Sequence, residues 1–244
     1  MNGLTGFGKS RMREKIDTLP CPLAFPGSFC TMLRPLISTN LAVTADGKIS
    51  SVTPRPTGWT SREDHARLLE LRADADAILV GRGTLDADRM TLTVPNRSAQ
   101  PLRCIVSRSG RIDPAHPIFA KAGGDIHLLV TGENPPSLTS PQDSRITVHH
   151  QTLRGFLHTL ASEFQVRRLH CEGGGQLIRA LAELDSIDEF HLTLAGHTLF
   201  GGQQAATATG IPAEFLPRSL DFEIRHFDPR PELGECFLSY ARRR

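Results

Sequence analysis

The chain has 244 residues, of which 39% are hydrophobic and 22% charged, a composition typical of a globular protein and not of a disordered one. Lys and Arg number 28 against 26 Asp and Glu, so the charge balance gives no electrostatic reason to expect nucleic acid or an anionic membrane as a partner. No apolar run approaches the ~20 residues that cross a bilayer. Five cysteines with irregular spacing and no CxxC pair favour a reducing compartment, and we expect the cytoplasm.

The first 33 residues differ from the rest of the chain. Glycines and prolines interrupt every possible helix or strand there, and no hydrophobic period survives. We therefore predict that residues 1–33 are a flexible N-terminal extension, or that the start is over-long and Met32 is an alternative first residue. Residues 34–244 show no composition shift and no repeat, which predicts a single domain.

Short apolar runs alternate with helical stretches from residue 36 onward. Strands are predicted at 36–43, 77–80, 102–107, 126–130, 146–149, 169–172 and 189–195. Helices are predicted from Ser61 to about 71, from Thr152 to about 164, and over 175–184. The late runs 221–227 and 235–240 predict an antiparallel pair. This pattern predicts an α/β fold with three layers, α/β/α, and a mostly parallel central sheet closed by the antiparallel strand pair.

Two junctions between a strand and the following loop are candidates for a binding site. The first runs from Val80 through Gly81 to Thr84 and Asp88, and the second is the triple glycine 173–175 after Glu172. Both place backbone N–H groups at the carboxyl edge of the sheet, where α/β folds bind ligands, and together they favour a nucleotide or phosphate site. The alternative is that each is only a tight turn that needs a positive φ. Neither matches GxGxxG or GxxxxGK[ST].

A third feature is the Asp46-Gly47 turn after the first predicted strand. With the two junctions it forms an ordered set: RPLISTNLAVTADGKIS (34–50), RADADAILVGRGTLDAD (72–88), HCEGGGQLIRALAELDSIDEFHLTLA (170–195) and LFGG (199–202). This set resembles the reductase domain of the riboflavin-biosynthesis deaminase/reductase and its stand-alone relatives, over about residues 34–241. The resemblance implies a dihydrofolate-reductase-like fold. It also implies an NADPH-dependent reductase that transfers hydride to the ribosylamino group of a pyrimidine 5′-phosphate.

The resemblance also implies site residues and a partner. It assigns cofactor binding to the two glycine junctions and the end of the first strand, namely Val43, Thr44, Gly81, Thr84, Asp88, Gly173, Gly174 and Gly175. It assigns substrate binding to Asn40, Arg72, Leu92 and Glu172. Asp46, or a water held by Glu172, is the expected proton donor, and Arg108 or Arg111 can pair with the 2′-phosphate of the cofactor. We also expect a homodimer, as is common in the family.

Some positions depart from the family pattern, mostly on the substrate side. Arg89 and Met90 replace an Asp and a Pro, Pro95 stands where a substrate-contacting Arg often lies, with Arg97 as a possible substitute, and Pro56 falls near another polar position. Two alternatives therefore stay open: a related NADPH reductase of another imine, pterin or carbonyl compound, and a non-catalytic nucleotide-binding module. The histidines show no ligand spacing, so no metal is expected.

Overall fold

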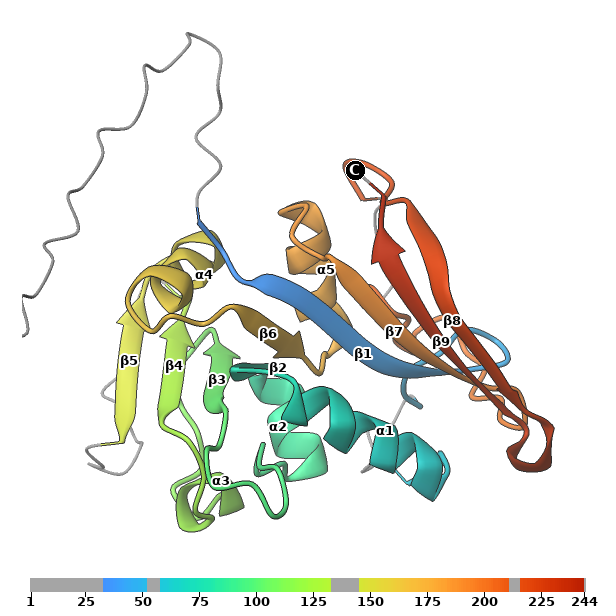
Figure 1. Ribbon diagram of the computed structural model, residues 1–244, viewed down its shortest axis with the longest axis horizontal. Coiled ribbons are helices and arrows are strands. Elements are labelled where there is room, and N and C mark those ends of the chain that lie inside the picture. Colours follow the sequence, from blue (N-terminus) through green and yellow to red (C-terminus); the bar gives the residue numbers. More distant parts are fainter. Residues whose placement is uncertain (1–32, 52–57, 133–144, 211–215, 244) are drawn as a thin grey trace, which may run out of the picture. The chain divides into compact units, whose positions relative to one another are not determined.

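A nine-stranded sheet organises the residues that the structure describes, in the order β5-β4-β3-β2-β6-β1-β7-β9-β8 (Figure 1). The structure is a computed structural model that describes residues 33–51, 58–132, 145–210 and 216–243. These residues belong to one compact unit, Leu33–Arg244. The predicted extension before residue 33 and the predicted substrate-side position Pro56 lie outside the described residues.

Eight of the nine strands run in one direction. β9 pairs antiparallel with β7 on one side and with β8 on the other, and the remaining pairs are parallel. The strands are β1 Leu36–Thr44, β2 Ala77–Gly81, β3 Leu102–Ser107, β4 Ile126–Val130, β5 Ile146–His150, β6 Arg168–Cys171, β7 Glu189–Ala195, β8 Phe222–Arg230 and β9 Glu235–Arg242. The predicted mostly parallel sheet with its antiparallel pair is therefore confirmed.

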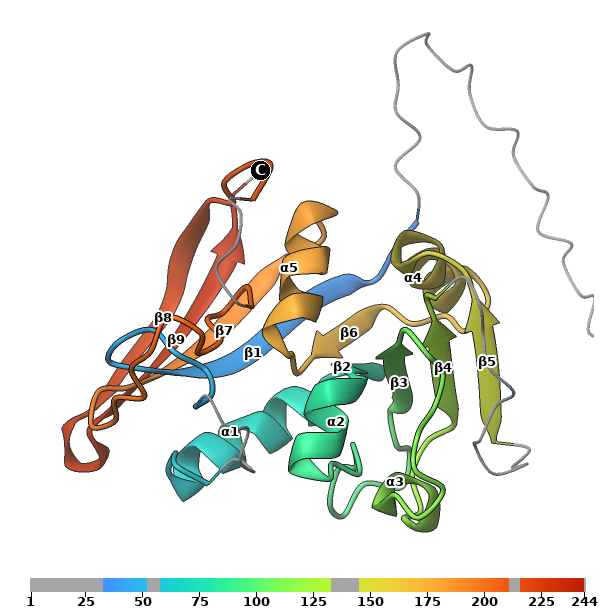
Figure 2. The same ribbon diagram turned by 180° about the vertical axis from the view of Figure 1, so that it is seen from behind.

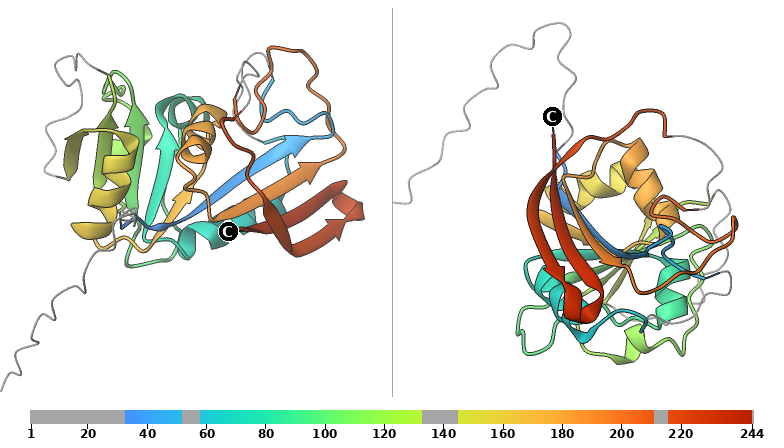
Figure 3. Two further views of the ribbon diagram at one scale, coloured as in Figure 1. Left: turned by 90° about the horizontal axis from the view of Figure 1, so that it is seen from above. Right: turned by 90° about the vertical axis from the view of Figure 1, so that its right-hand side faces the viewer.

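Helices cover both faces of the sheet, as the prediction of three layers requires. The helices α4 and α5 lie on one face, and α1, α2 and α3 on the other (Figures 1 and 2). Their bounds are α1 Arg62–Ala73, α2 Arg82–Asp88, α3 Pro117–Ala120, α4 Leu153–Ser162 and α5 Gly175–Glu183, and a short 3-10 turn, Pro231–Leu233, joins β8 to β9. Seen from above, the strands follow one another across the sheet from β5 to the β8–β9 hairpin (Figure 3).

The alternation of side chains along the strands divides the core into two clusters. In β2, Ala77 and Leu79 face α4 and α5, where they meet Phe156 and its neighbours, while Ile78 and Val80 pack with Leu85 and Ile118 on the opposite face. Because β2 is buried on both faces, it reads as a continuous apolar run, which is typical of a central parallel strand.

The first helix is attached in a different way. None of its residues belongs to either core cluster, and Arg72 is its one buried residue. Polar contacts hold it instead: Ser61, its N-cap, donates to the buried Glu235, and Arg67 donates to the carbonyls of Leu192 and Leu238. Polar contacts therefore dominate the attachment of α1, together with the buried Phe237 ring, whose centroid lies 5.5 Å from the Arg67 guanidinium.

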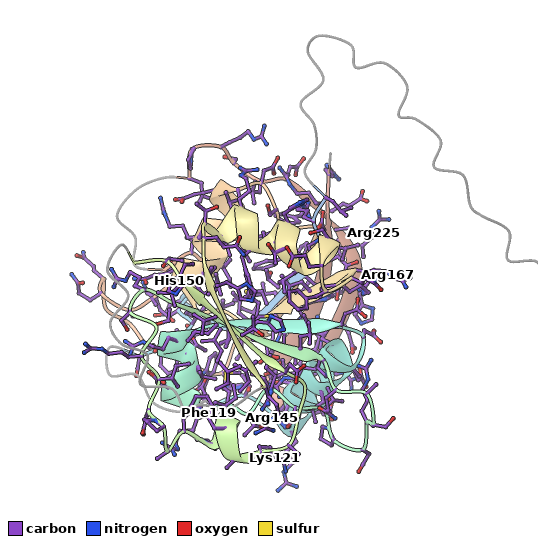
Figure 4. The ribbon with its side chains drawn as sticks, turned by 90° about the vertical axis from the view of Figure 1, so that its left-hand side faces the viewer. Phe119, Lys121, Arg145, His150, Arg167 and Arg225 are labelled. Carbon is purple, nitrogen blue, oxygen red and sulfur yellow. The ribbon has the colours of Figure 1, made fainter. Side chains whose placement is uncertain are left out.

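The strands β5 and β8 form the two edges of the sheet. At the β5 edge, Arg145 directly precedes the strand and His150 ends it, and Arg145 donates to the carbonyl of Phe119 on α3 (3.4 Å) (Figure 4). At the opposite edge, β8 continues to Arg230, three residues past its predicted end at 227. The short helix α3 has no hydrophobic period and was not predicted.

One mismatch of strand lengths bears on function. The ladder between β1 and β6 ends at the pair Thr39–Cys171, whereas the ladder between β1 and β7 continues to Thr44–Ala195. Residues 40–44 of β1 therefore extend past the end of β6, and their strand edge on that side faces the loops that follow β2 and β6. This edge belongs to the carboxyl end of the sheet, where open α/β sheets bind ligands.

Candidate active site

The two glycine junctions meet at the carboxyl edge of the sheet. β2 and β6 are neighbours, and the N–H of Gly81 donates to the carbonyl of Gly173 over 3.0 Å. The Thr84 hydroxyl lies against Gly174 so closely that a Cβ on Gly174 would be 2.7 Å from it. Figure 2 shows the start of α2, the tip of β6 and the start of α5 side by side. Four of the predicted cofactor residues are thus brought together.

The loop after β6 leads directly into α5. Gly174 is the N-cap of α5 and no side chain caps this helix, so the helix start can bind an anion through its backbone N–H groups. Gly173 has a φ of 91° and is joined to Gly174 by a cis peptide bond. A Cβ on Gly175 would lie 2.4 Å from the backbone nitrogen of Gly210. Only glycine fits at that close approach.

The end of β1 lies beside these loops. Val43 is buried in the core that faces α5, and Thr44 is fully buried. The Thr44 hydroxyl donates to the Asp46 carboxylate, which also accepts hydrogen bonds from the N–H groups of Phe200 (3.4 Å) and Gly201 (2.7 Å). These hydrogen bonds, that of Thr44 first, lower the pKa of Asp46 below its ordinary value.

The predicted role of Asp46 as a proton donor stays a prediction, and the hydrogen bonds of Asp46 favour its ionised carboxylate. A carboxyl group with a lowered pKa holds its proton weakly, whereas a general acid at neutral pH needs a raised pKa. The geometry of Asp46 instead ties the end of β1 to the Gly-Gly loop at Gly201.

A buried ion pair joins α1 to the end of β6. The Nε and Nη2 atoms of Arg72 donate to the two carboxylate oxygens of Glu172 over 2.5 and 2.7 Å, and both side chains are almost fully buried. Burial alone would lower the pKa of Arg72, but the charge and hydrogen bonds of Glu172 outweigh it, and the pKa is raised. The third nitrogen of Arg72 approaches the carbonyl of Thr93 (3.4 Å). Arg72 therefore positions Glu172, and its predicted contact with the substrate stays a prediction.

Three other predicted residues lie in different surroundings. Asn40 lies on β1 and points to the face that α1 covers, and its Oδ1 atom is buried without a partner in the described residues. Asp88 ends α2. Leu92 is fully buried in the core cluster below α2, and its role in substrate binding stays a prediction. The apolar character of Leu92 serves the core.

The loop of residues 89–97, which departs from the family pattern, is held by packing and hydrogen bonds. Arg89 ends α2 in the left-handed conformation, and Met90 packs against the core below that helix. Gln100 bonds both backbone groups of Val94, next to Pro95. Arg97, the possible substitute for a substrate-contacting Arg, donates to the carbonyl of Ala73.

Two polar features of the site region were not predicted. Ser38 and His170 pair on the α1 face, with 2.9 Å between Oγ and Nδ1, and no sequence pattern links two residues so far apart in the chain. Arg82 stands at the tip of β2 beside the tip of β3, because Gly81 pairs with Val106. The sequence signal for Arg82 was its place inside the first glycine junction.

The described part of the chain contains no group of three or more potential metal ligands and no helix long and apolar enough to cross a membrane.

The fold has solved counterparts. The chain superposes on RibD of Acinetobacter baumannii with a TM-score of 0.72 and 23% identity, which covers 86% of this chain and 59% of that one. It superposes on the riboflavin biosynthesis reductase of Saccharomyces cerevisiae with a TM-score of 0.64 and 18% identity, over 89% of this chain and 94% of that one. These likenesses define the class of the fold, which is dihydrofolate-reductase-like.

Sequence comparison identifies the family. Residues 35–228 match the RibD C-terminal domain, and the chain belongs to that family. A relative from Methanothermobacter thermautotrophicus is 31% identical over 183 residues (72% of this chain and 83% of the relative), and one from Archaeoglobus fulgidus is 29% identical over 197 residues (72% and 86%). Both relatives are named 2,5-diamino-6-ribosylamino-4(3H)-pyrimidinone 5′-phosphate reductase. The predicted family is therefore confirmed.

Proposed function

We propose that this protein is an NADPH-dependent reductase that transfers hydride to the ribosylamino group of a pyrimidine 5′-phosphate in riboflavin biosynthesis. The observation that carries the proposal is the family match over residues 35–228. The names of the two archaeal relatives support the substrate class, and the meeting of the two glycine junctions supports the use of a nicotinamide cofactor.

The residues at the carboxyl edge fit such a cofactor. The uncapped start of α5 suits the pyrophosphate. A Cβ on Gly83 would meet no atom within 4 Å, so the first turn of α2 is open at this glycine and leaves room for a ligand. The end of β1 extends past β6, and we expect the nicotinamide to bind beside it, next to Val43 and Thr44. When bound, the cofactor supplies the hydride.

Two arginines support NADPH over NADH. Arg82 follows β2 and Arg108 follows β3, and the pairing of Gly81 with Val106 brings these strand tips together. Guanidinium groups bind phosphate through two N–H donors, so this pair suits the 2′-phosphate that only NADPH carries. Replacing Arg82 and Arg108 by Gln should weaken NADPH binding and leave NADH binding unchanged.

On the substrate side, the protein orients a polar heterocycle. The Glu172 carboxylate, held by Arg72, keeps acceptor capacity for the amino groups of a pyrimidine. Hydride goes to C1′ of the open-chain imine and its nitrogen takes a proton, which a water held by Glu172 can deliver. Asp46 keeps the loop at Gly201 in place.

The experiment is a direct assay. NADPH and the family's pyrimidine phosphate are mixed with the protein, and loss of the reduced-cofactor absorbance is followed. Turnover supports the proposal, and none at high protein concentration rejects it. Tight NADPH binding without turnover would favour another imine, pterin or carbonyl substrate, or a non-catalytic module. Rescue of a riboflavin auxotroph that lacks the reductase tests the same function in cells.

Gly83→Ala provides a matched test of the cofactor site. Gly83 lies in α2 with free space around it, so alanine should stabilise the helix by about 0.5–1 kcal/mol. In the same variant, the added methyl group should weaken NADPH binding. Unchanged affinity would contradict this placement of the cofactor.

A homodimer and a cytoplasmic location complete the proposal. Ile224 and Phe227 of β8 are 59% and 62% exposed, and they share a sheet face because they pair opposite Tyr240 and Leu238. An exposed apolar pair of this kind suits a protein interface. Phe227→Asp should shift sedimentation from dimer to monomer. The cysteine usage favours the cytoplasm.

A further inference from the structure

Among the residues that the structure describes, two buried polar atoms on the sheet face below α1 lack a hydrogen-bond partner. They are the Nε2 atom of His170 and the Oδ1 atom of Asn40. Ser38 pairs with His170 across the β1–β6 ladder, and Asn40 is the next residue of β1 on the same face. With about 3.3 Å of rise per residue and strands about 4.8 Å apart, the Cα atoms of His170 and Asn40 are about 8 Å apart.

Both atoms are able to form a hydrogen bond that the described residues do not supply. His170 is 1% exposed, and burial, with the charge of Arg72 among the smaller causes, lowers its pKa to about 3. The imidazole is therefore neutral at neutral pH, with one nitrogen bonded to Ser38 and the other unpaired. A buried polar atom without a hydrogen bond destabilises the fold, so each of the two needs a hydrogen-bonding partner.

One water satisfies both atoms in either tautomer. If Ser38 donates to Nδ1, then Nε2 carries a hydrogen, and a water accepts from it and donates to Asn40. If Nδ1 donates to Ser38, then Nε2 is an acceptor, and the same water donates one hydrogen to each atom. Buried waters typically make two to four such bonds.

We propose that His170, fixed by Ser38, positions Asn40 through one bridging water, so that the Asn40 carboxamide presents its NH2 group to the substrate. The inference rests on the proposed function and specifies it: Asn40 recognises a hydrogen-bond acceptor, such as a ring carbonyl or a phosphate oxygen. His170 acts through Asn40 and is a positioning residue.

A crystal structure of the full chain tests the water directly. We expect one ordered water within about 3.2 Å of both atoms. Direct contact of the two side chains, or a site without water density, overturns the proposal. This readout stays valid if the protein fails to reduce the pyrimidine phosphate, so it separates failure of the inference from failure of the proposed function.

A pair of substitutions tests the positioning role. The amide of His170→Gln reaches the place of Nε2, whereas the amide of His170→Asn reaches only that of Nδ1. We expect KM for the pyrimidine phosphate to rise about tenfold in His170→Asn and to stay near the wild-type value in His170→Gln. The dissociation constant for NADPH should be unchanged in both variants.

The pair also separates positioning from a general structural effect. Unfolding by urea is measured for both variants, and a structural role alone predicts equal changes in KM, or changes that follow stability. Equal KM values in the two variants overturn the proposal. Asn40→Asp, which has a similar shape but no N–H donor, should raise KM at least as much as His170→Asn does.

Discussion

Loss of one charge from the Arg72–Glu172 pair should destabilise the fold strongly. Arg72 makes two hydrogen bonds to Glu172, at 2.5 and 2.7 Å, in surroundings that exclude solvent from both side chains. Glu172→Gln keeps one acceptor oxygen but leaves the guanidinium charge buried and unpaired. Breaking a buried pair in this way costs about 3–5 kcal/mol. Because one bond survives, we expect a loss of about 3 kcal/mol in the free energy of unfolding.

The assay is urea unfolding at pH 7, with the slope m compared between variants. The matched control is Glu183→Gln on α5, whose partner Arg179 lies one turn earlier, at 2.9 Å, on an exposed helix surface. Such a pair is worth about 0.3–0.5 kcal/mol. If Glu172→Gln lowers the free energy of unfolding no more than Glu183→Gln does, the buried ion pair does not stabilise the fold as argued.

A double variant separates stability from function at the same site. Replacing both partners of a buried ion pair with apolar residues is often neutral or stabilising. Arg72→Met combined with Glu172→Leu should therefore recover most of the lost stability but not the reductase activity. Recovery of activity would contradict the proposed contact between Glu172 and the substrate.

Three further predictions concern other parts of the chain. Burial, and for His127 also the neighbouring His149, lowers the pKa of His127 to about 4 and that of His170 to about 3. The unfolded chain therefore binds more protons below pH 6.5, and stability should fall as pH drops from 6.5 to 4, by about 3 kcal/mol for His127. Urea unfolding at pH 7 and 4.5 checks this, and an equal drop in His127→Phe would contradict it. Gly175→Ala places a Cβ 2.4 Å from a backbone nitrogen and should cost about 1–3 kcal/mol; an unchanged melting temperature would refute the close approach. A chain that begins at Met32 should melt like the full chain, and clear destabilisation would reject the predicted extension.

Much of the fold could be predicted because its signals are local. The strands 102–107, 126–130 and 189–195 were predicted with the bounds that the structure has, since each is a short apolar run between polar turns. Ser61 and Thr152 cap their helices as predicted. In contrast, α3 is a single turn set by Pro117, too short to show a helical period.

The site was predicted less completely because its contacts join distant residues. The glycine junctions carry a local pattern, and the structure brings them together. Nothing in the sequence indicates that the Arg72 guanidinium donates hydrogen bonds to Glu172, a hundred positions later. Nor does it indicate that the Asp46 carboxylate accepts a hydrogen bond from the N–H group of Gly201. Leu92 matches the family pattern, yet its side chain belongs to the core. A motif specifies residue types and not what each side chain contacts.

The polar attachment of α1 has a thermal consequence. Exposure of apolar surface raises heat capacity, whereas exposure of polar surface lowers it. Local release of α1 would expose the hydrogen-bonding groups around Arg67 and Glu235 and the Phe237 ring, whereas release of α5 would expose Leu177, Ile178 and Leu181. The enthalpy of releasing α1 should therefore change less with temperature than that of releasing α5. Two helices on opposite faces of one sheet thus respond differently to warming.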